Sequence, residues 1–347
     1  MNIKFFAPLF FLAIILFACE KKYQPRNFET VEIENITIDS TSIRAIQIKK
    51  DSSLIFATSN GFIGLLSASD LEIKKKKIVY DTIIPHFRSI ASVNNSTFAL
   101  SIGNPALLYQ YKNESLTIVY KEVHPKVFYD AMLFFDEENG IAMGDPIEEC
   151  LSIIITKNGG STWEKLPCGI LPFIENGEAA FAASNSNIAI AGSNAWLVTG
   201  GQKARVFHTP DMGKTWEVFN TPIVSGSQMT GIYSVDFYDE RNGIIFGGDW
   251  HDKKNNVANK AITSDGGKTW QLVSDGEGPG YKSCVQYVPN TKGNELFAVG
   301  STGVSFSNDS GKSWRKVSDE GYYTIRFVNE NFAWLAGKNK IGKMILK

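Results

Sequence analysis

Residues of the types that bind ligands are concentrated in an eight-residue stretch, TSDGGKTW, at positions 263–270. Aspartate, glycine, lysine and threonine in so short a run are typical of loops that bind a phosphate or a calcium ion. Three other stretches share the pattern Ser/Thr-x-Asp/Asn-x-Gly-x-Ser/Thr-Trp: TKNGGSTW at 156–163, TPDMGKTW at 209–216 and SNDSGKSW at 307–314. Their tryptophans are 53, 54 and 44 residues apart along the chain, which indicates a repeat and not a single site.

The segments around each copy predict a structural role. Each copy follows an apolar run and precedes a second short strand, as in LSIIIT before WEKL, which predicts the turn of a β-hairpin. In such a turn the aspartate accepts backbone N–H bonds, the glycine adopts a positive φ and the tryptophan packs into the core. A phosphate loop would instead lead into a helix, and a calcium loop would run for about 12 residues to a glutamate. We assign the structural role to Asn158, Gly160, Trp163, Asp211, Gly213, Trp216, Asp265, Gly267, Trp270, Asp309, Gly311 and Trp314.

The four stretches resemble Asp-box (BNR) repeats, which occur in sialidases, in sortilin-type receptors and in photosystem II assembly-factor-like propellers. In those families the Asp box is structural, so the resemblance implies an architecture and leaves the activity open. Phrases such as GDP (144–146), GEAAFAAS and GYKSCV resemble bacterial members of the assembly-factor-like group across most of residues 40–345. That resemblance implies a propeller that binds other proteins during assembly, although nothing in the chain points to a photosystem.

A longer period accompanies these turns. Seven repeats cover about 318 residues at roughly 45 each, which suits a four-stranded propeller blade. We therefore predict an all-β fold, a seven-bladed β-propeller of four-stranded antiparallel blades; six or eight blades fit the spacing less well. The last repeat is one strand short, and NFETVEIENITI (27–38) can supply that strand and close the ring. The repeats open at IRAIQIKK (43–50), FRSIASV (87–93), YDAMLFF (129–135), EAAFAAS (178–184), IYSVDFY (232–238), YKSCVQYV (281–288) and YYTIRFV (322–328).

Blade topology predicts where polar side chains converge. The first strand of a blade starts, and the second ends, at one face of the ring, while the box turns lie at the opposite face. Charged residues at these positions should meet at the mouth of the central channel and bind a ligand or a partner, either a protein or a glycan. Two other interpretations are that the charges satisfy one another around a wet channel, or that they form a catalytic site. The candidates are Arg88, Asp130, Asp145, Glu178, Asp249, Lys282 and Arg326.

The enzymatic interpretation meets a difficulty in the arginines. Sialidases clamp a carboxylate with three arginines, and FRSI around Arg88 resembles their FRIP signature, with Ser89-Ile90 in place of Ile-Pro. Of the seven arginines, we expect only Arg88 and Arg326 to reach the channel, so a clamp is not convincingly present. The four histidines lack metal-ligand spacing, and we predict no metal and no cofactor. We favour a non-catalytic binding or assembly propeller; the alternatives are a sialidase-like or other glycan-directed hydrolase and a structural subunit of an outer-membrane complex.

The N-terminus predicts export and membrane anchoring. A basic MNIK precedes the 14-residue apolar run FFAPLFFLAIILFA, which is short for a membrane span and typical of a signal peptide. Its end, LFAC, resembles the lipobox of bacterial lipoproteins, so Cys19 is the expected lipidation site. We predict a signal peptide at 1–18, a lipidated cysteine and polar tether at 19–28 and one propeller at 29–347. The lipobox resemblance implies a place in the bacterial cell envelope, lipid-anchored in the outer membrane. The formal net charge of −1 argues against nucleic acid as a partner, and the chain is expected to be a monomer or part of a larger envelope complex.

Two further features have open interpretations. Cys150 and Cys168 flank a predicted hairpin, where they form either a cross-strand disulfide or, with Cys284, a set of buried thiols. The run KKKK at 74–77 is interpreted as a solvated edge.

Overall fold

The computed structural model describes residues 23–347, so the predicted signal peptide and Cys19 lie outside the described residues. Strands make up the regular structure of this part of the chain, together with one 3-10 helix, η1 (Cys168–Ile170). Within residues 23–347, no helix has both the length and the apolar character needed to cross a bilayer. The fold is therefore all-β, as the hairpin repeats predict.

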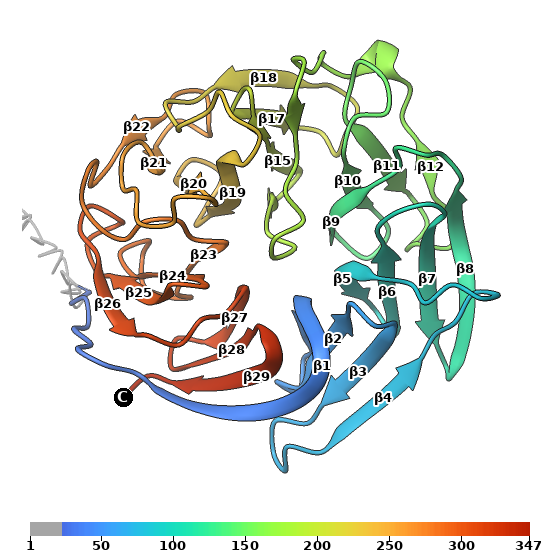
Figure 1. The fold of residues 1–347 in the computed structure, drawn as a ribbon, viewed down its shortest axis with the longest axis horizontal. Helices are drawn as coiled ribbons and strands as arrows, with labels where there is room; N and C mark the ends of the chain where they lie inside the picture. The colour runs from blue at the N-terminus through green and yellow to red at the C-terminus, as the bar shows by residue number, and fades with distance from the viewer. Residues whose placement is uncertain (1–22) are drawn as a thin grey trace, which may run out of the picture.

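The sheets are arranged radially around a central axis, which is the architecture of a β-propeller (Figure 1). Three antiparallel sheets have four strands in chain order: β5 (Phe87–Val93), β6 (Ser96–Ser101), β7 (Ala106–Lys112) and β8 (Ser115–Glu122); β9 (Tyr129–Phe134), β10 (Gly140–Gly144), β11 (Ser152–Thr156) and β12 (Glu164–Lys165); and β23 (Cys284–Tyr287), β24 (Leu296–Gly300), β25 (Gly303–Ser307) and β26 (Arg315–Ser318). A fourth sheet contains β14 (Ile188–Ala191), β15 (Asn194–Val198), β17 (Arg205–Thr209) and β18 (Glu217–Asn220).

Two larger sheets complete the ring. One has six strands, in which β13 (Glu178–Ala179) and β16 (Gly200–Gly201) extend β19 (Thr230–Phe237), β20 (Gly243–Asp249), β21 (Lys260–Thr263) and β22 (Gln271–Leu272). The other has seven strands in the order β27 (Thr324–Asn329), β28 (Phe332–Ala336), β29 (Lys338–Ile345), β1 (Glu32–Ile48), β2 (Leu54–Thr58), β3 (Phe62–Leu66) and β4 (Ile73–Lys77).

The long strand β1 joins the two ends of the chain. Its first half pairs with β29 from Glu32↔Ile345 to Thr37↔Lys340, and its second half pairs with β2 from Ile43↔Thr58 onward. Between these halves the register shifts, so β1 is the outer strand of one group of four and the inner strand of the next. The prediction that the N-terminal segment supplies the strand missing from the last repeat is confirmed by this pairing.

One predicted strand is wrong. EAAFAAS was expected to open a blade, but only Glu178–Ala179 is a strand, and it pairs with β16 in the following sheet. The inner strand of that blade is instead β14 (Ile188–Ala191). Residues 180–187 leave the sheet and reach the centre of the ring, where Figure 1 shows them as a yellow-green loop. Most of their side chains are buried by the surrounding blades. Their small, partly apolar sequence therefore resembles that of a buried strand.

Candidate functional site

The four box turns satisfy their polar groups internally. The Asp265 carboxylate accepts hydrogen bonds from the Thr269 backbone N–H (3.0 Å), the Thr269 hydroxyl (2.6 Å) and the Thr263 hydroxyl (2.7 Å). Gly267, at φ +83°, donates its N–H to the Thr263 hydroxyl, and Trp270 donates its indole N–H to the Gly267 carbonyl. Asp211 and Asp309 accept equivalent bonds within their own turns. The carboxylates are thus occupied by local backbone and hydroxyl groups, which is the arrangement of a structural turn.

Asn158 holds its turn in the same way. Its side-chain oxygen accepts from the Thr162 N–H (3.0 Å) and the Thr156 hydroxyl (3.0 Å), and Gly160 donates to that hydroxyl. The indole N–H of Trp163 is the exception, since it is buried with no hydrogen-bond partner.

The face of the ring that carries these four turns is called the box face below, and the opposite face, where the innermost strands start, is called the mouth face.

The central channel is crossed by residues Ala180–Asn187, called the plug below. Three arginines from three different strands hold it through its carbonyl oxygens. Arg88 of β5 donates to the Ala182 carbonyl (2.6 Å), and Arg44 of β1 donates to the Ala183 carbonyl (3.0 Å). Arg326 of β27 donates to the carbonyls of Ser184 (3.3 Å) and Asn185 (2.8 Å). The guanidinium groups therefore fix the position of a chain segment and do not converge on an open carboxylate site.

Side chains of the plug bind the remaining inner strands. Asn185 donates to the Ile90 carbonyl (3.0 Å) and accepts from the Met132 N–H (3.0 Å), which ties it to β5 and β9. The Ser184 hydroxyl donates to the Ser283 carbonyl, and the Ser186 hydroxyl lies 2.8 Å from that of Ser234 in β19. The plug thus connects strands from most of the ring, and of its buried side-chain polar atoms only Asn187 Oδ1 has no hydrogen-bond partner.

Arg44 is a channel residue that the sequence analysis missed, because it expected only Arg88 and Arg326 to reach the channel. The Arg44 guanidinium stacks on the ring of Tyr323 at 3.8 Å, and its Nε is buried without a hydrogen-bond partner. Aligning IRAI of the first repeat with FRSI of the second places Arg44 and Arg88 in the same position of their strands. That comparison of equivalent positions would have found it.

Charged groups beside the plug have strongly altered acidities. Burial, together with the positive charges of Arg88 and Arg44, lowers the pKa of His86 to about 4, and His86 accepts a hydrogen bond from Arg88 Nε (2.9 Å). Burial and the neighbouring Arg44 lower the pKa of Arg88 to about 10. The two guanidinium groups have no carboxylate within ion-pair distance in the described part of the chain. The mouth of the channel therefore concentrates positive charge that the protein itself does not neutralise.

Two predicted carboxyl groups lie beside the plug. Asp130 is fully buried and neither of its oxygens has a hydrogen-bond partner. Burial raises the pKa of Asp130 well above its usual value, and the nearby Asp145 adds to the effect while Arg88 opposes it. Asp145 accepts from the Ala180 N–H (3.0 Å), and burial raises its pKa to about 6. The structure thus brings Arg88, Asp130 and Asp145 together around the plug, where burial favours the neutral form of the Asp130 carboxyl group.

Other predicted site residues have separate environments. Glu178 forms a buried ion pair with Arg205 (2.6 Å) and also accepts from the Thr199 hydroxyl (2.5 Å). Lys282 donates to the Gly303 carbonyl (2.7 Å), and burial lowers its pKa to about 7. Asp249 accepts from the His251 N–H (2.7 Å) at the end of β20. Glu178 and Lys282 are therefore committed to contacts inside the protein.

Below the plug, a cavity of about 410 Å³ opens on the box face. Its polar lining comes from Asp236 of β19, Gln286 of β23 and Arg326 of β27, with apolar walls such as Val235 and Ile188. Burial raises the pKa of Asp236 to about 7, although the Tyr287 N–H donates to its carboxyl group (2.7 Å). The plug thus separates the mouth from this lower part of the channel.

Exposed apolar side chains gather on the mouth face. The loops that precede an innermost strand or follow a second strand open on this face, and eight of the ten most exposed large apolar side chains among the described residues lie in such loops. Of these, Phe173 is 70% exposed and Trp250 is 42% exposed, while the box face has Tyr238. Large exposed apolar groups commonly mark contact surfaces. The eight are Val79, Ile83, Ile84, Val123, Ile170, Phe173, Trp250 and Val257.

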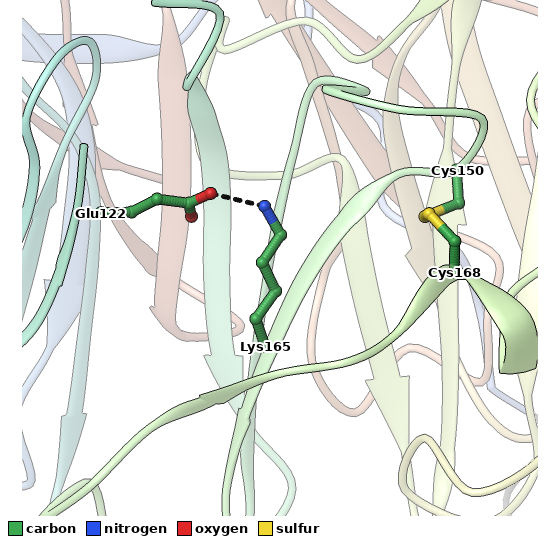
Figure 2. The surroundings of a disulfide bond; sticks show 4 residues. All are labelled: Glu122, Cys150, Lys165 and Cys168. Carbon is green, nitrogen blue, oxygen red and sulfur yellow. Dashed lines mark hydrogen bonds and ion pairs between the residues drawn. A yellow bond between two sulfur atoms is a disulfide. The ribbon is translucent and has the colours of Figure 1, made fainter. Parts of the chain in front are cut away.

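A disulfide bond holds the loop that leads into the plug. Cys150 and Cys168 are bonded to each other, with their Cα atoms 5.5 Å apart, and Cys284 is a buried free thiol. Figure 2 shows this bond beside the ion pair between Lys165 and Glu122 (2.5 Å), which joins β12 to the end of β8. Both links hold the N-terminal side of the loop around η1, one to the β10–β11 loop through Cys150 and the other to β8 through Glu122. Within residues 23–347, no group of three or more His, Cys, Asp or Glu side chains is placed to hold a metal ion.

Comparisons with known proteins identify the fold. No protein-family model and no curated protein matches the chain. Among solved structures it is similar to YCF48 bound to D1 peptide, with a TM-score of 0.65 and 15% identity over 92% of this chain and 100% of that one. YCF48 from Cyanidioschyzon merolae gives a TM-score of 0.61 at 12% identity, covering 90% of this chain and 98% of that one. Selenomethionine-substituted virginiamycin B lyase from Staphylococcus aureus gives 0.60 at 9%, covering 91% and 100%. At these identities the likeness shows a β-propeller fold alone.

Proposed function

We propose that this protein is a non-catalytic binding or assembly-factor-like propeller, anchored to the cell envelope, whose partner protein binds the mouth face. The observation that carries the proposal is the distribution of exposed apolar side chains, which lie in the mouth-face loops and include Phe173 and Trp250. Aromatic side chains of this kind are the usual centres of protein–protein contact energy. The unneutralised guanidinium groups of Arg44 and Arg88 lie at the centre of the same face and favour a partner with acidic groups.

We further infer that the ring has seven blades and that its four tryptophan-ending turns are Asp boxes. Dividing β1 between its two partners leaves seven groups of four strands. Of the eight buried apolar clusters among the described residues, seven are each shared by two neighbouring groups, and the eighth gathers around Ala183 of the plug. The similarity to YCF48 bound to D1 peptide is consistent with a peptide-binding or protein-binding role, because that propeller is described with a bound peptide.

Site-specific photo-crosslinking in intact cells tests the proposed face. A photoreactive amino acid replaces Trp250 or Phe173 on the mouth face and, as the control, Lys214 or Lys268 on the box face. The proposal expects a discrete crosslinked partner from the mouth-face positions and none from the box-face positions. Equal crosslinking from both faces would instead indicate a structural subunit embedded in a larger complex, and crosslinks from the box face alone would refute the proposed surface.

Anchoring through Cys19 has its own test. The LFAC motif supports lipidation at this residue, and the polar segment after it can act as a tether. Changing Cys19 to serine should release the protein from the membrane fraction. Retention of the Cys19→Ser protein in membranes would contradict the lipid anchor without affecting the proposed binding face.

The enzymatic alternative keeps one observation in its favour, since three arginines do reach the channel. Arg44, Arg88 and Arg326 nevertheless bind plug carbonyls, so a carboxylate clamp would require the plug to move. Turnover of fluorogenic sialosides or other glycosides by the pure protein would establish this alternative in place of the proposal.

A further inference from the structure

The tryptophan of each box turn fills the space between its own blade and the preceding blade. Trp163 of the β9–β12 blade packs against Phe98 of the β5–β8 blade and against Phe134, with ring centroids 6.3 and 5.7 Å apart. Trp314 likewise packs against Phe246 of the preceding blade, at 5.5 Å. Trp216 and Trp270 join the clusters at the two interfaces between these. An indole ring therefore belongs to the normal packing of a blade interface in this protein.

Three interfaces lack such a tryptophan, because the blade on one side has no box turn. Two of them are filled by another aromatic ring. Trp334 of β28 lies between the β27–β29 sheet and the β1–β4 blade, where it is fully buried. Phe28 lies between the β23–β26 blade and the β27–β29 strands, where it packs edge-on against Phe306 at 5.0 Å.

The third interface, between the β1–β4 and β5–β8 blades, is packed by Phe87 and Tyr109 over part of its area, but it is open beside the β7–β8 turn. Asn113 and Glu114 form its short β7–β8 turn, and no tryptophan is present there. Tyr111 and Leu116, which pair across β7 and β8 beside this turn, line a groove of about 300 Å³ instead. The other apolar walls are Ile55, Ile63, Leu65 and Ile78. A volume of this size accommodates an indole-sized group, since an apolar cavity of roughly 150 Å³ already accepts benzene.

Lysines surround this groove. The KKKK run forms the outer strand β4, at the edge of the ring in Figure 1, and Lys74, Lys75 and Lys76 line the groove together with Lys49. Lys74 makes only a solvent-exposed pair with Glu72 at 3.5 Å. Neither Lys75 nor Lys76 has a carboxylate within ion-pair distance among residues 23–347. The groove thus combines an apolar floor with a positive rim, which favours an occupant that is apolar at one point and acidic around it.

The N-terminal segment provides an internal example of how such an interface is filled. It approaches from outside the blades, inserts Phe28 into the interface and pairs Arg26 with Glu295 at the rim (2.7 Å). The Arg26 guanidinium also lies over the Phe28 ring, at 5.0 Å. An extended segment with one aromatic anchor and a flanking charge therefore suffices to close an interface that lacks a box tryptophan. At the open interface the rim is basic, so the complementary segment carries acidic residues.

We propose that the groove between the β1–β4 and β5–β8 blades, called the lysine groove, binds an extended acidic segment of a partner protein. One large apolar side chain of that segment occupies the position of the missing tryptophan, and its carboxylates face Lys74 and Lys76, which pair with the groove residues Leu65 and Ile63 and so lie on the groove side of β4. The free edge of β4 offers backbone groups to the same segment. Lysines on an edge strand also discourage unselective pairing, which restricts the occupant to an acidic sequence. The lysine groove is on the flank of the ring, and its occupancy does not depend on the mouth-face partner.

The test uses purified full-length protein and a fluorescein-labelled peptide, EDEWEDE, measured by fluorescence polarisation. We expect a dissociation constant between about 10 µM and 1 mM at low salt, weakening as salt increases. The control peptides EDEAEDE and KSKWKSK should bind at least about tenfold more weakly, a difference of about 1.4 kcal/mol. Leu116→Trp should fill the groove and abolish binding. Thr97→Phe, at a second lining position, is the substitute if Leu116→Trp lowers thermal stability.

A charge-swap pair completes the design. Lys74→Glu combined with Lys76→Glu should weaken binding of EDEWEDE at least about tenfold, whereas Lys214→Glu combined with Lys268→Glu, which makes the same charge change on the box face, should leave it unchanged. Binding that survives both Leu116→Trp and Thr97→Phe, or that ignores the lysine swap, would overturn the proposal. So would the absence of peptide binding together with groove-dependent binding to phosphatidylglycerol vesicles, which would assign the surface to a membrane.

Discussion

The box turns and the plug are both held in place by hydrogen bonds, but their bonds span very different distances along the chain. In the turn at Asp265, the bonded side chains are two to four residues apart. In the plug, the arginines and the carbonyls that they bind are 94 to 142 residues apart. The box turn is thus a local structure that each hairpin can form by itself. The plug exists only after the ring has closed and brought β1, β5 and β27 to the same axis.

This difference separates architecture from candidate function. The local bonds leave the box carboxylates without free capacity for a ligand, which accounts for the structural role of these turns. The long-range contacts instead gather charged groups whose needs the protein meets only in part, as the bare oxygens of Asp130 and the free Nε of Arg44 show. Incompletely satisfied groups of this kind cost stability and are commonly kept for a function.

The largest expected effect on stability comes from breaking a long-range contact next to the plug, the buried ion pair of Glu178. Glu178→Gln leaves the Arg205 guanidinium buried without its carboxylate, so the free energy of unfolding should fall by about 3–5 kcal/mol. Chemical denaturation monitored by tryptophan fluorescence measures this change. The double variant Glu178→Gln with Arg205→Met should lose less than the sum of the two single variants, because it removes both charges. A loss below about 1 kcal/mol for Glu178→Gln would show that the pair does not hold the plug.

A smaller loss of stability is expected when the locally bonded structure, a box turn, is disrupted. Asp265→Ala removes the acceptor of bonds from Thr263 and Thr269 in one turn, which should cost about 1–2 kcal/mol. Lys268→Ala in the same turn is the matched control and should stay within about 0.5 kcal/mol of the wild type. If Asp265→Ala cost as much as Glu178→Gln, the turn would be a cooperative part of the ring and the contrast would fail.

The stability that the Asp265 turn contributes should also depend on pH. Although burial raises the pKa of Asp265, hydrogen bonds from Thr269 and Thr263 outweigh it and lower the pKa to about 2. Because the folded-state pKa lies below the ordinary value, this group's stabilisation is present above about pH 4 and is lost as the pH falls toward 2. The stability difference between the wild type and Asp265→Ala should therefore shrink over that range.

The smallest effect on stability is expected from substituting Asp236, in the lower channel. This substitution should stabilise the protein, whereas the others destabilise it. Burial raises the pKa of Asp236 to about 7, so its neutral form is favoured by folding and the group loses stability as the pH rises through 7. Asp236→Asn should thus be more stable than the wild type at pH 8.5, by about 1 kcal/mol after allowance for solvent in the cavity, and equal to it near pH 4. Thermal melts at both values measure this, with Asp239→Asn on an exposed loop as the control. A pH-independent difference would mean that Asp236 does not titrate in this range.

Much of the fold could be predicted because it follows from local pattern. FRSIASV became β5 over the predicted residues, and the segment before Ile38 pairs with β29 as expected. The prediction that EAAFAAS is the first strand of a blade was wrong, because burial in the channel produces the same apolar pattern as burial in a sheet. Arg44 was missed although its position repeats that of Arg88, and Glu178 was placed at the mouth although its partner is Arg205. The repeat alignment could have found Arg44, but no local pattern shows that Arg205 reaches the Glu178 carboxylate from another strand.

By itself, the sequence determined the repeat, the hairpin turns, the all-β class and the need for an N-terminal strand, because each depends on residues close together or on a regular period. Only the tertiary structure decided which charges meet. The plug, its three arginines, the Glu178–Arg205 pair and the unfilled lysine groove all join residues from separate blades. Their contacts depend on ring closure and on the exact volume left between neighbouring blades, and these quantities arise from the packing of the whole molecule.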